Sequence, residues 1–188
     1  MSDISFLILV SVTILSITTL LISNSSQTVL IFLGILYLCS FLMLLQIWPL
    51  GLAFVHLLTG LLTVLVINSL CSQLTWQSES PRIAMDILMV VFVGVITFAF
   101  APQLSAYLTE SSEFLIIGFF MFVIGLLQVG TSQDTFRILI SLFIFALGFQ
   151  VLYAPLEGSA LVTALISVIQ LVMAFVGSRM VVKNKEEI

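Results

Sequence analysis

Residues 52–71 read LAFVHLLTGLLTVLVINSLC, a stretch that contains no Asp, Glu, Lys or Arg. A helix of about 20 apolar residues spans the hydrocarbon core of a bilayer, which is roughly 30 Å thick. A helix also satisfies its own backbone hydrogen bonds, which lipid cannot do, and the period-two alternation typical of a membrane strand is missing here. The stretch therefore predicts a transmembrane helix.

The whole chain has a similar composition. Its 188 residues are 61% hydrophobic and 7% charged, with a net charge of −4. Such a chain has too few polar groups to cover a water-soluble domain, and its weak charge gives no reason to expect nucleic acid as a partner. Apolar segments of helical length occur at 4–23, 28–48, 52–71, 84–101, 114–130, 137–154 and 159–181. The expected fold is an all-α, polytopic transmembrane bundle of about seven helices.

The basic residues set the expected orientation. With seven helices, all of them lie on one side of the membrane: Arg82, Arg137, Arg179, Lys183 and Lys185. The positive-inside rule makes that side cytoplasmic, so the N-terminus is expected outside and the C-terminus inside, in the cell (inner) membrane. The opposite side has no Lys or Arg and carries Asp3, Glu110, Glu113 and Glu157. Trp48 is expected near the outer boundary, where interfacial aromatic residues belong.

One transmembrane domain over 1–188 is expected, with three parts. A three-helix unit (1–83) is followed by a linking helix and outer loop (84–113) and by a second three-helix unit (114–188). The pairs Ser26-Gln27 and Pro49-Leu50 recur 106 residues later as Ser132-Gln133 and Pro155-Leu156. This recurrence favours a parallel 3+1+3 repeat, in which the fourth helix gives both units the same orientation.

The sequence contains no motif of a soluble enzyme, nucleotide-binding loop or metal site, so no catalytic residue, cofactor or metal is expected. His56 is the only histidine and is interpreted as a structural or interfacial residue. Asp86, at the start of the fourth helix, is expected to pair with Arg82 or to reach water, with a role in proton entry as the alternative. Asp134 and Arg137 are expected to form a solvated pair at the start of the sixth helix.

Amide side chains are the polar groups expected inside the membrane: Gln46, Asn68, Gln128, Gln150 and Gln170. Such amides hold helices together by about 0.6–2 kcal/mol each, but they do not exchange protons at physiological pH. Gln150 and Gln170, on neighbouring helices, are expected to pair with each other or with a partner subunit. Lining of a hydrated path is the alternative.

The small residues and the cysteines are the remaining residues for which the sequence predicts a structural role or state. Close helix packing, within the chain or against another protein, is expected at Gly118, Gly125, Ala146 and Gly148. Cys39 and Cys71 are expected at different depths in the membrane, too far apart for a disulfide, and therefore as free thiols.

The C-terminal part resembles known small membrane subunits. Residues 119–126 (FFMFVIGL) and 136–142 (FRILISL) are similar to the first two helices of the K-type subunit of respiratory complex I. Residues 155–166 (PLEGSALVTALI) resemble a Pro-Leu-x-x-Ala-Leu-Val-Leu-Thr-Ala-Ile stretch of the C-type subunit of Mrp Na⁺/H⁺ antiporters. A longer form with extra N-terminal helices occurs as the E-type component of related membrane-bound hydrogenases. The resemblance implies the same outside-to-inside topology.

The resemblance fails at the residues that conduct protons. In the K-type subunit, glutamates inside the second and third helices are assigned to proton transfer. The corresponding positions here hold Phe143 and, in the last helix, Ile169 or Gln170, and none of these side chains titrates. The resemblance therefore implies a subunit that lacks the proton-conducting carboxylates.

The expected function follows from these points. It is that of a non-catalytic integral membrane subunit of a complex-I-like, Mrp-antiporter-like or hydrogenase-like ion-translocating complex. Such a subunit would scaffold or seal the larger antiporter-like subunits, and its partners would be those subunits and the lipid bilayer. A stand-alone small-solute transporter or channel and a structural or assembly membrane protein are the alternatives. An enzyme is not expected, because no nucleophile is paired with a base.

Overall fold

The computed structural model describes residues 3–71, 83–107, 112–156 and 158–186. The described residues form helices and no strands, which confirms the predicted all-α bundle. The helices are α1 (Asp3–Ile22), α2 (Ser26–Leu44), α3 (Leu50–Cys71), α4 (Ile83–Tyr107), α5 (Ser112–Thr131), α6 (Thr135–Tyr153) and α7 (Ala160–Glu186).

Five of the described helices are long and apolar enough to cross a membrane: α2, α3, α4, α6 and α7. The described apolar segments of α1 and α5, Leu7–Ile22 and Leu115–Thr131, are somewhat shorter. By the length and composition of its helices, the chain is a multi-pass membrane protein that contacts the lipid bilayer.

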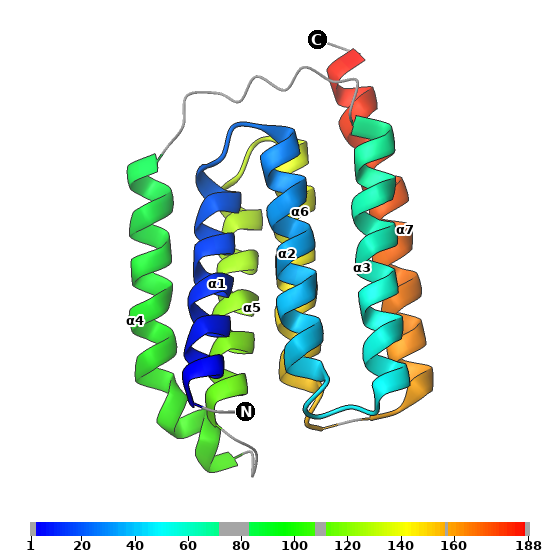
Figure 1. Ribbon diagram of the computed structural model, residues 1–188. Coiled ribbons are helices and arrows are strands. Elements are labelled where there is room, and N and C mark those ends of the chain that lie inside the picture. Colours follow the sequence, from blue (N-terminus) through cyan, green and yellow to red (C-terminus); the bar gives the residue numbers. More distant parts are fainter. Residues whose placement is uncertain (1–2, 72–82, 108–111, 157, 187–188) are drawn as a thin grey trace.

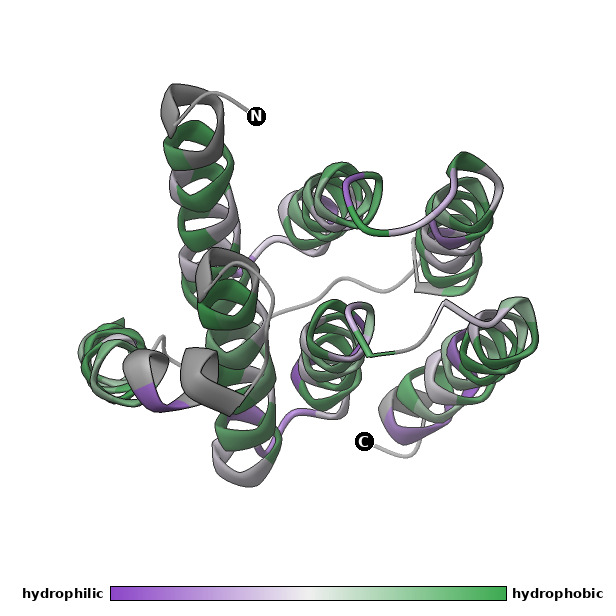
Figure 2. Ribbon diagram, turned by 90° about the horizontal axis from the view of Figure 1, so that it is seen from below, coloured by the Kyte–Doolittle hydropathy of each residue, from purple (hydrophilic) through white to green (hydrophobic). Residues whose placement is uncertain are grey.

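The helices form two facing layers with one helix at the side. The first layer contains α1, α2 and α3, and the second contains α5, α6 and α7 (Figures 1 and 2). The second layer follows the same order behind the first, so α2 packs on α6 and α3 packs on α7. Helix α4 lies beside α1 and α5. The core lies between the layers, and its fully buried side chains include Leu33, Leu36, Phe143, Ile144 and Leu147.

The alternating direction of the helices brings the described basic residues to one end. Arg137 lies in the first turn of α6, and Arg179 and Lys183 lie in the last turns of α7; both of these helix ends are at the top in Figure 1. We name this the basic end, which is the cytoplasmic side in the orientation predicted from the sequence. We name the opposite end, where α2 turns into α3 and α6 into α7, the outer end.

Glycines let α5 and α6 approach each other closely. A Cβ atom added at Gly125 would overlap the backbone of Phe145, and one added at Gly148 would overlap the backbone of Phe122. The rings of Phe122 and Phe145 pack beside these contacts in a tilted arrangement, with centroids 4.6 Å apart. Gly125 and Gly148, two of the small residues predicted for close packing, therefore lie where α5 and α6 approach each other inside the chain, as expected of helices that associate in lipid.

Trp48 connects the two outer turns. Its Nε1–H donates a hydrogen bond of 3.0 Å to the carbonyl oxygen of Ala154, which follows the last residue of α6. Carbonyls at a helix C-terminus lack a partner within the helix, so the indole satisfies one of them. Trp48 lies at the outer end as predicted, but its side chain is buried at 5% exposure and does not face the membrane boundary.

One boundary prediction is wrong. The fourth helix was expected to end before Pro102, but α4 continues to Tyr107. The matching residue pairs of the predicted repeat lie 106 residues apart, whereas α6 begins 109 residues after α2 (135 against 26). The reason is local: Ser26-Gln27 lies in the first turn of α2, whereas Ser132-Gln133 precedes α6, whose N-cap is Asp134.

Candidate functional site

A buried set of polar side chains links four helices at the seam between the two layers. Its members are Tyr37 and Ser40 of α2, His56 of α3, Gln150 of α6 and Gln170 of α7, and each is at most 2% exposed. We call this set the polar ring. All five residues lie in the halves of their helices nearest the outer end. Burial of polar groups is costly unless they bond to one another, so these contacts fix how the four helices meet.

The contacts of the polar ring run from helix to helix. The Tyr37 hydroxyl donates to Gln170 Oε1 over 3.5 Å, and Gln170 Nε2 donates to Gln150 Oε1 over 3.3 Å. Gln150 also interacts with the His56 side chain. His56 Nε2 lies 2.8 Å from Ser40 Oγ, and the Ser40 hydroxyl donates over 2.9 Å to the Tyr37 carbonyl oxygen. The path starts and ends on α2.

The structure thus joins two of the predicted amides, Gln150 and Gln170, directly to each other. It also joins His56 to them, and the only histidine of the chain is fully buried. Tyr37 and Ser40 were not predicted. Their spacing of three residues puts both hydroxyls on one face of an otherwise apolar helix, and this signal in the sequence would have found them.

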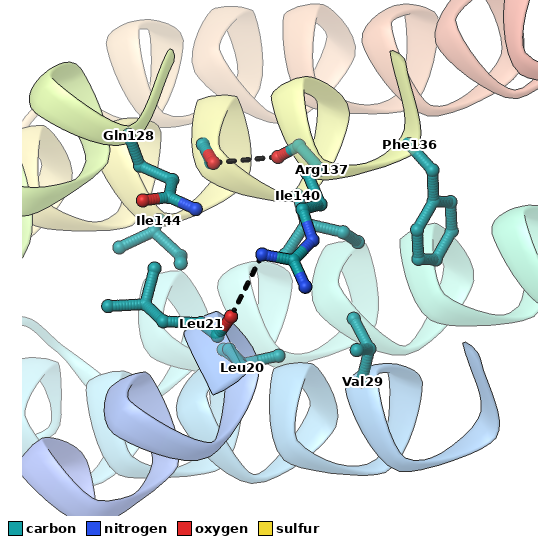
Figure 3. Close-up of a pocket in the computed structure, with 9 residues that line it drawn as sticks. Leu20, Leu21, Val29, Gln128, Phe136, Arg137, Ile140 and Ile144 are labelled. Carbon is teal, nitrogen blue, oxygen red and sulfur yellow. Dashed lines mark hydrogen bonds between the residues drawn. The ribbon is translucent and has the colours of Figure 1, made fainter. Parts of the chain in front are cut away.

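A second polar cluster lies at the basic end, around Arg137. Its Nη1 atom lies 3.6 Å from Asp86 Oδ2 of α4 and donates over 3.2 Å to the carbonyl oxygen of Leu21. Its Nη2 atom donates over 3.1 Å to Asn24 Oδ1, just after α1. Figure 3 shows the guanidinium of Arg137 extending toward Leu21. Arg137 therefore connects α6 with α4 and with the end of α1.

A small cavity adjoins Arg137 and is lined by both layers. Its volume of about 10 Å³ is enough for roughly one water molecule. Gln128 lines it together with Arg137 and mainly aliphatic neighbours (Figure 3), and the buried Gln128 Oε1 has no hydrogen-bond partner among the described residues.

The observed contacts of Asp86, Asp134 and Arg137 include partners that were not predicted. Asp86 is paired with Arg137, while the expected partner Arg82 lies outside the described residues. Asp134 is the N-cap of α6 and accepts a hydrogen bond of 3.2 Å from the Phe136 N–H, while Arg137 extends toward α1 and α4. Helix capping and a buried carboxylate on another helix therefore determine these contacts.

The prediction that all five amides are buried is wrong for two of them. Gln46 and Asn68 are exposed on the outside of the chain, whereas Gln128, Gln150 and Gln170 are buried. Gln46 lies in the outer turn after α2, and Asn68 lies in the last turn of α3, where an amide side chain can reach the membrane boundary. Cys39 is buried and free, as predicted, and the side chain of Cys71 lies outside the described residues.

We expect replacement of Gln150 by leucine to destabilise the bundle. Gln150→Leu leaves the buried Gln170 Nε2 without its acceptor, and we expect a loss of about 1–2 kcal/mol in the free energy of unfolding. Unfolding in mixed micelles measures this loss, with Gln27→Leu as the control on an exposed glutamine. The double variant Gln150→Leu/Gln170→Leu should lose less than the two single losses added together. Strict additivity would contradict the contact between the two amides.

Comparison with protein-family models, with curated proteins and with solved structures gives no match for this chain. Among the described residues, no three His, Cys, Asp or Glu side chains come together as a metal site would require.

Proposed function

We propose that this chain is a non-catalytic integral membrane subunit of an ion-translocating complex of the complex-I, Mrp-antiporter or hydrogenase type, in the cell (inner) membrane. In this role it scaffolds larger antiporter-like subunits or seals one of their lateral faces. The resemblance of residues 114–188 to the K-type and C-type subunits supports the choice of complex. The observation that carries the proposal is the apolar, outward-facing surface of α4 and α7.

Helices α4 and α7 keep most of their apolar surface outside the bundle. Only 22% of the membrane-spanning segment of each is buried in the chain, compared with 50% for α2 and 56% for α6. Large side chains such as Phe98 (79% exposed) and Leu161 (74% exposed) project from them. Such surfaces suit contact with lipid and with the helices of partner subunits.

The interior supports a scaffolding role as well. The buried amides of the polar ring are hydrogen bonded to each other, and amide side chains do not carry protons at physiological pH. The position that corresponds to the second-helix glutamate of the K-type subunit holds the fully buried Phe143, which fills the core between the layers. We therefore assign ion transfer to the partner subunits.

Purification from native membranes in a mild detergent tests the proposal. A tagged chain should co-migrate with larger multi-span subunits, which mass spectrometry identifies as antiporter-like or quinone-reactive proteins. A tagged, unrelated multi-span protein of the same membrane serves as the control for incidental association. Migration of the chain without any such partner would contradict the proposal.

A stand-alone small-solute transporter is the second candidate, and one observation favours it. The polar ring lies at the seam between the two three-helix layers, the kind of position where repeat-built transporters bind their substrates. The purified chain, reconstituted alone into liposomes, would then catalyse uptake. Uptake that Gln150→Leu abolishes would favour this candidate over the subunit role.

A further inference from the structure

The hydrogen bonds of the polar ring have a defined direction, which fixes the protonation of His56. Ser40 has one hydroxyl hydrogen, and it is donated to the carbonyl oxygen of Tyr37. The 2.8 Å contact between Ser40 Oγ and His56 Nε2 therefore needs the hydrogen on Nε2. The neutral imidazole is the Nε2–H tautomer, and its Nδ1 atom carries a lone pair.

One link in the polar ring, between His56 and Gln150, is not closed by a hydrogen bond, and its two unpaired atoms are an acceptor and a donor. His56 Nδ1 and Gln150 Nε2 are both buried, and neither has a hydrogen-bond partner among the described residues. The two side chains interact with each other. Because Nδ1 is an acceptor and the amide Nε2 is a donor, a hydrogen bond between them would close the link. All the hydrogen bonds then run in one donor-to-acceptor direction around the path. They lead from Tyr37 to α7, then to α6 and α3, and back to α2.

The same side chains can also form a second arrangement, in which the bonds that link His56, Gln150, Gln170 and the Tyr37 hydroxyl run in the opposite direction, while the bonds from His56 to Ser40 and from Ser40 to the Tyr37 carbonyl stay as they are. A proton on His56 Nδ1 turns that atom into a donor, and the Gln150 amide must turn over to present Oε1 to it. Gln150 Nε2 then faces Gln170, whose amide turns over for the same reason. Gln170 Nε2 finally donates to the oxygen of Tyr37, so the Tyr37 hydroxyl hydrogen needs a new acceptor.

Thr63 supplies that acceptor. Its side chain interacts with Tyr37, is fully buried and has an Oγ1 atom without a hydrogen-bond partner among the described residues. A buried unpaired hydroxyl is unfavourable in the first arrangement. In the second arrangement it receives the Tyr37 hydrogen bond, which accounts for a threonine at this position of α3.

We propose that the polar ring is a proton-operated switch with two hydrogen-bonded states, in which protonation of His56 turns over both amides and moves the Tyr37 hydroxyl to Thr63. The proton is added to Nδ1 and no covalent bond breaks. The switch alters contacts across the seam between the layers, and it does not depend on which partner the chain has.

Among the described residues, the side chains that face His56 belong to the polar ring, so the added proton acts on that ring. From α2, the titratable group that faces His56 is Tyr37, whose ring centroid is 5.6 Å away, and Cys39 faces Thr13 of α1 instead. From α6 and α7, the facing groups are the two amides. Arg137 lies 13 residues from Gln150 along α6, about 20 Å away at 1.5 Å per residue, and Arg179 and Lys183 lie toward the basic end of α7.

Nitrogen-15 NMR of the full chain in lipid nanodiscs tests this proposal. His56 is the only histidine, so its two ring nitrogens are assigned without ambiguity. At neutral pH we expect Nε2 protonated and Nδ1 unprotonated. On acidification, the second proton should appear on Nδ1, and the side-chain amide signals of Gln150 and Gln170 should shift with the same midpoint. The variants Gln150→Leu and Gln170→Leu assign these amide signals.

A pair of threonine variants separates the switch from a general effect of acid. Thr63→Val removes the acceptor needed only in the protonated state, so its midpoint should fall by about one pH unit. Thr59→Val is the control, because the Thr59 hydroxyl bonds to its own helix at Val55, and its midpoint should not change. The proposal is overturned by an Nδ1–H tautomer at neutral pH, by amide signals that stay unchanged, by equal midpoints in the two variants, or by unfolding before His56 gains its second proton.

Discussion

Arg137→Met should lower the free energy of unfolding by about 3 kcal/mol. The substitution leaves Asp86 in a site where its side chain is 8% exposed, without the guanidinium that lies 3.6 Å from it. Removal of one partner from a buried ion pair costs about 3–5 kcal/mol, and we expect the lower end because Arg137 is 15% exposed. The bonds to Leu21 and Asn24 are lost as well.

Two further variants separate the ion pair from the loss of a positive charge. Arg179→Met removes another basic residue of the same end, but Arg179 is exposed, and its guanidinium lies 5.3 Å from the ring centroid of Phe175 on its own helix. We expect a loss below about 1 kcal/mol for it. The double variant Asp86→Leu/Arg137→Met removes both charges and should regain most of the stability. Equal stability of Arg137→Met and Arg179→Met in unfolding experiments would show that the pair does not form.

Gly148→Ala should destabilise the bundle by about 2–3 kcal/mol. The added methyl group would overlap the backbone of Met121 and Phe122 on α5, and backbone cannot move aside as the end of a side chain can. Overpacking of this kind costs roughly 1–3 kcal/mol, and we expect the upper part of that range because α5 and α6 are the most extensively packed pair of helices. Unfolding in mixed micelles measures the effect.

Gly94→Ala is the matched control for this variant. Gly94 also lies inside a helix, but a Cβ atom added there meets nothing within 4 Å. Alanine is intrinsically more favourable than glycine in a helix by up to about 1 kcal/mol, so Gly94→Ala should be neutral or slightly stabilising. A similar loss in both variants would contradict the close approach of α5 and α6.

Composition was enough to predict the helices of this bundle. A bilayer requires about 20 apolar residues per span, and each of the seven predicted segments overlaps one of the described helices. The error at Pro102 has a physical reason, because proline interrupts helical hydrogen bonds in water but is tolerated in membrane helices. Helix ends are therefore harder to predict than helix centres.

The packing partners could not be predicted from composition. In a membrane helix, the side facing lipid is as apolar as the side facing the core, so hydrophobic periodicity does not distinguish them. Asn68 was therefore expected inside and is exposed, while Tyr37 is fully buried. The contact of Asp86 with Arg137 joins helices that are distant in sequence, and the local spacing of Asp134 and Arg137 gave no indication of it.

Site-specific photo-crosslinking in native membranes tests the central claim, that the outer faces of α4 and α7 contact a partner subunit. A photoreactive phenylalanine analogue at Phe98 or Leu161, both largely exposed, should form covalent adducts with a larger membrane polypeptide. The same analogue at Phe143, which is fully buried between the layers, should give crosslinks only within the chain. Adducts with lipid alone from both exposed positions, in membranes that contain the full set of native proteins, would contradict the account.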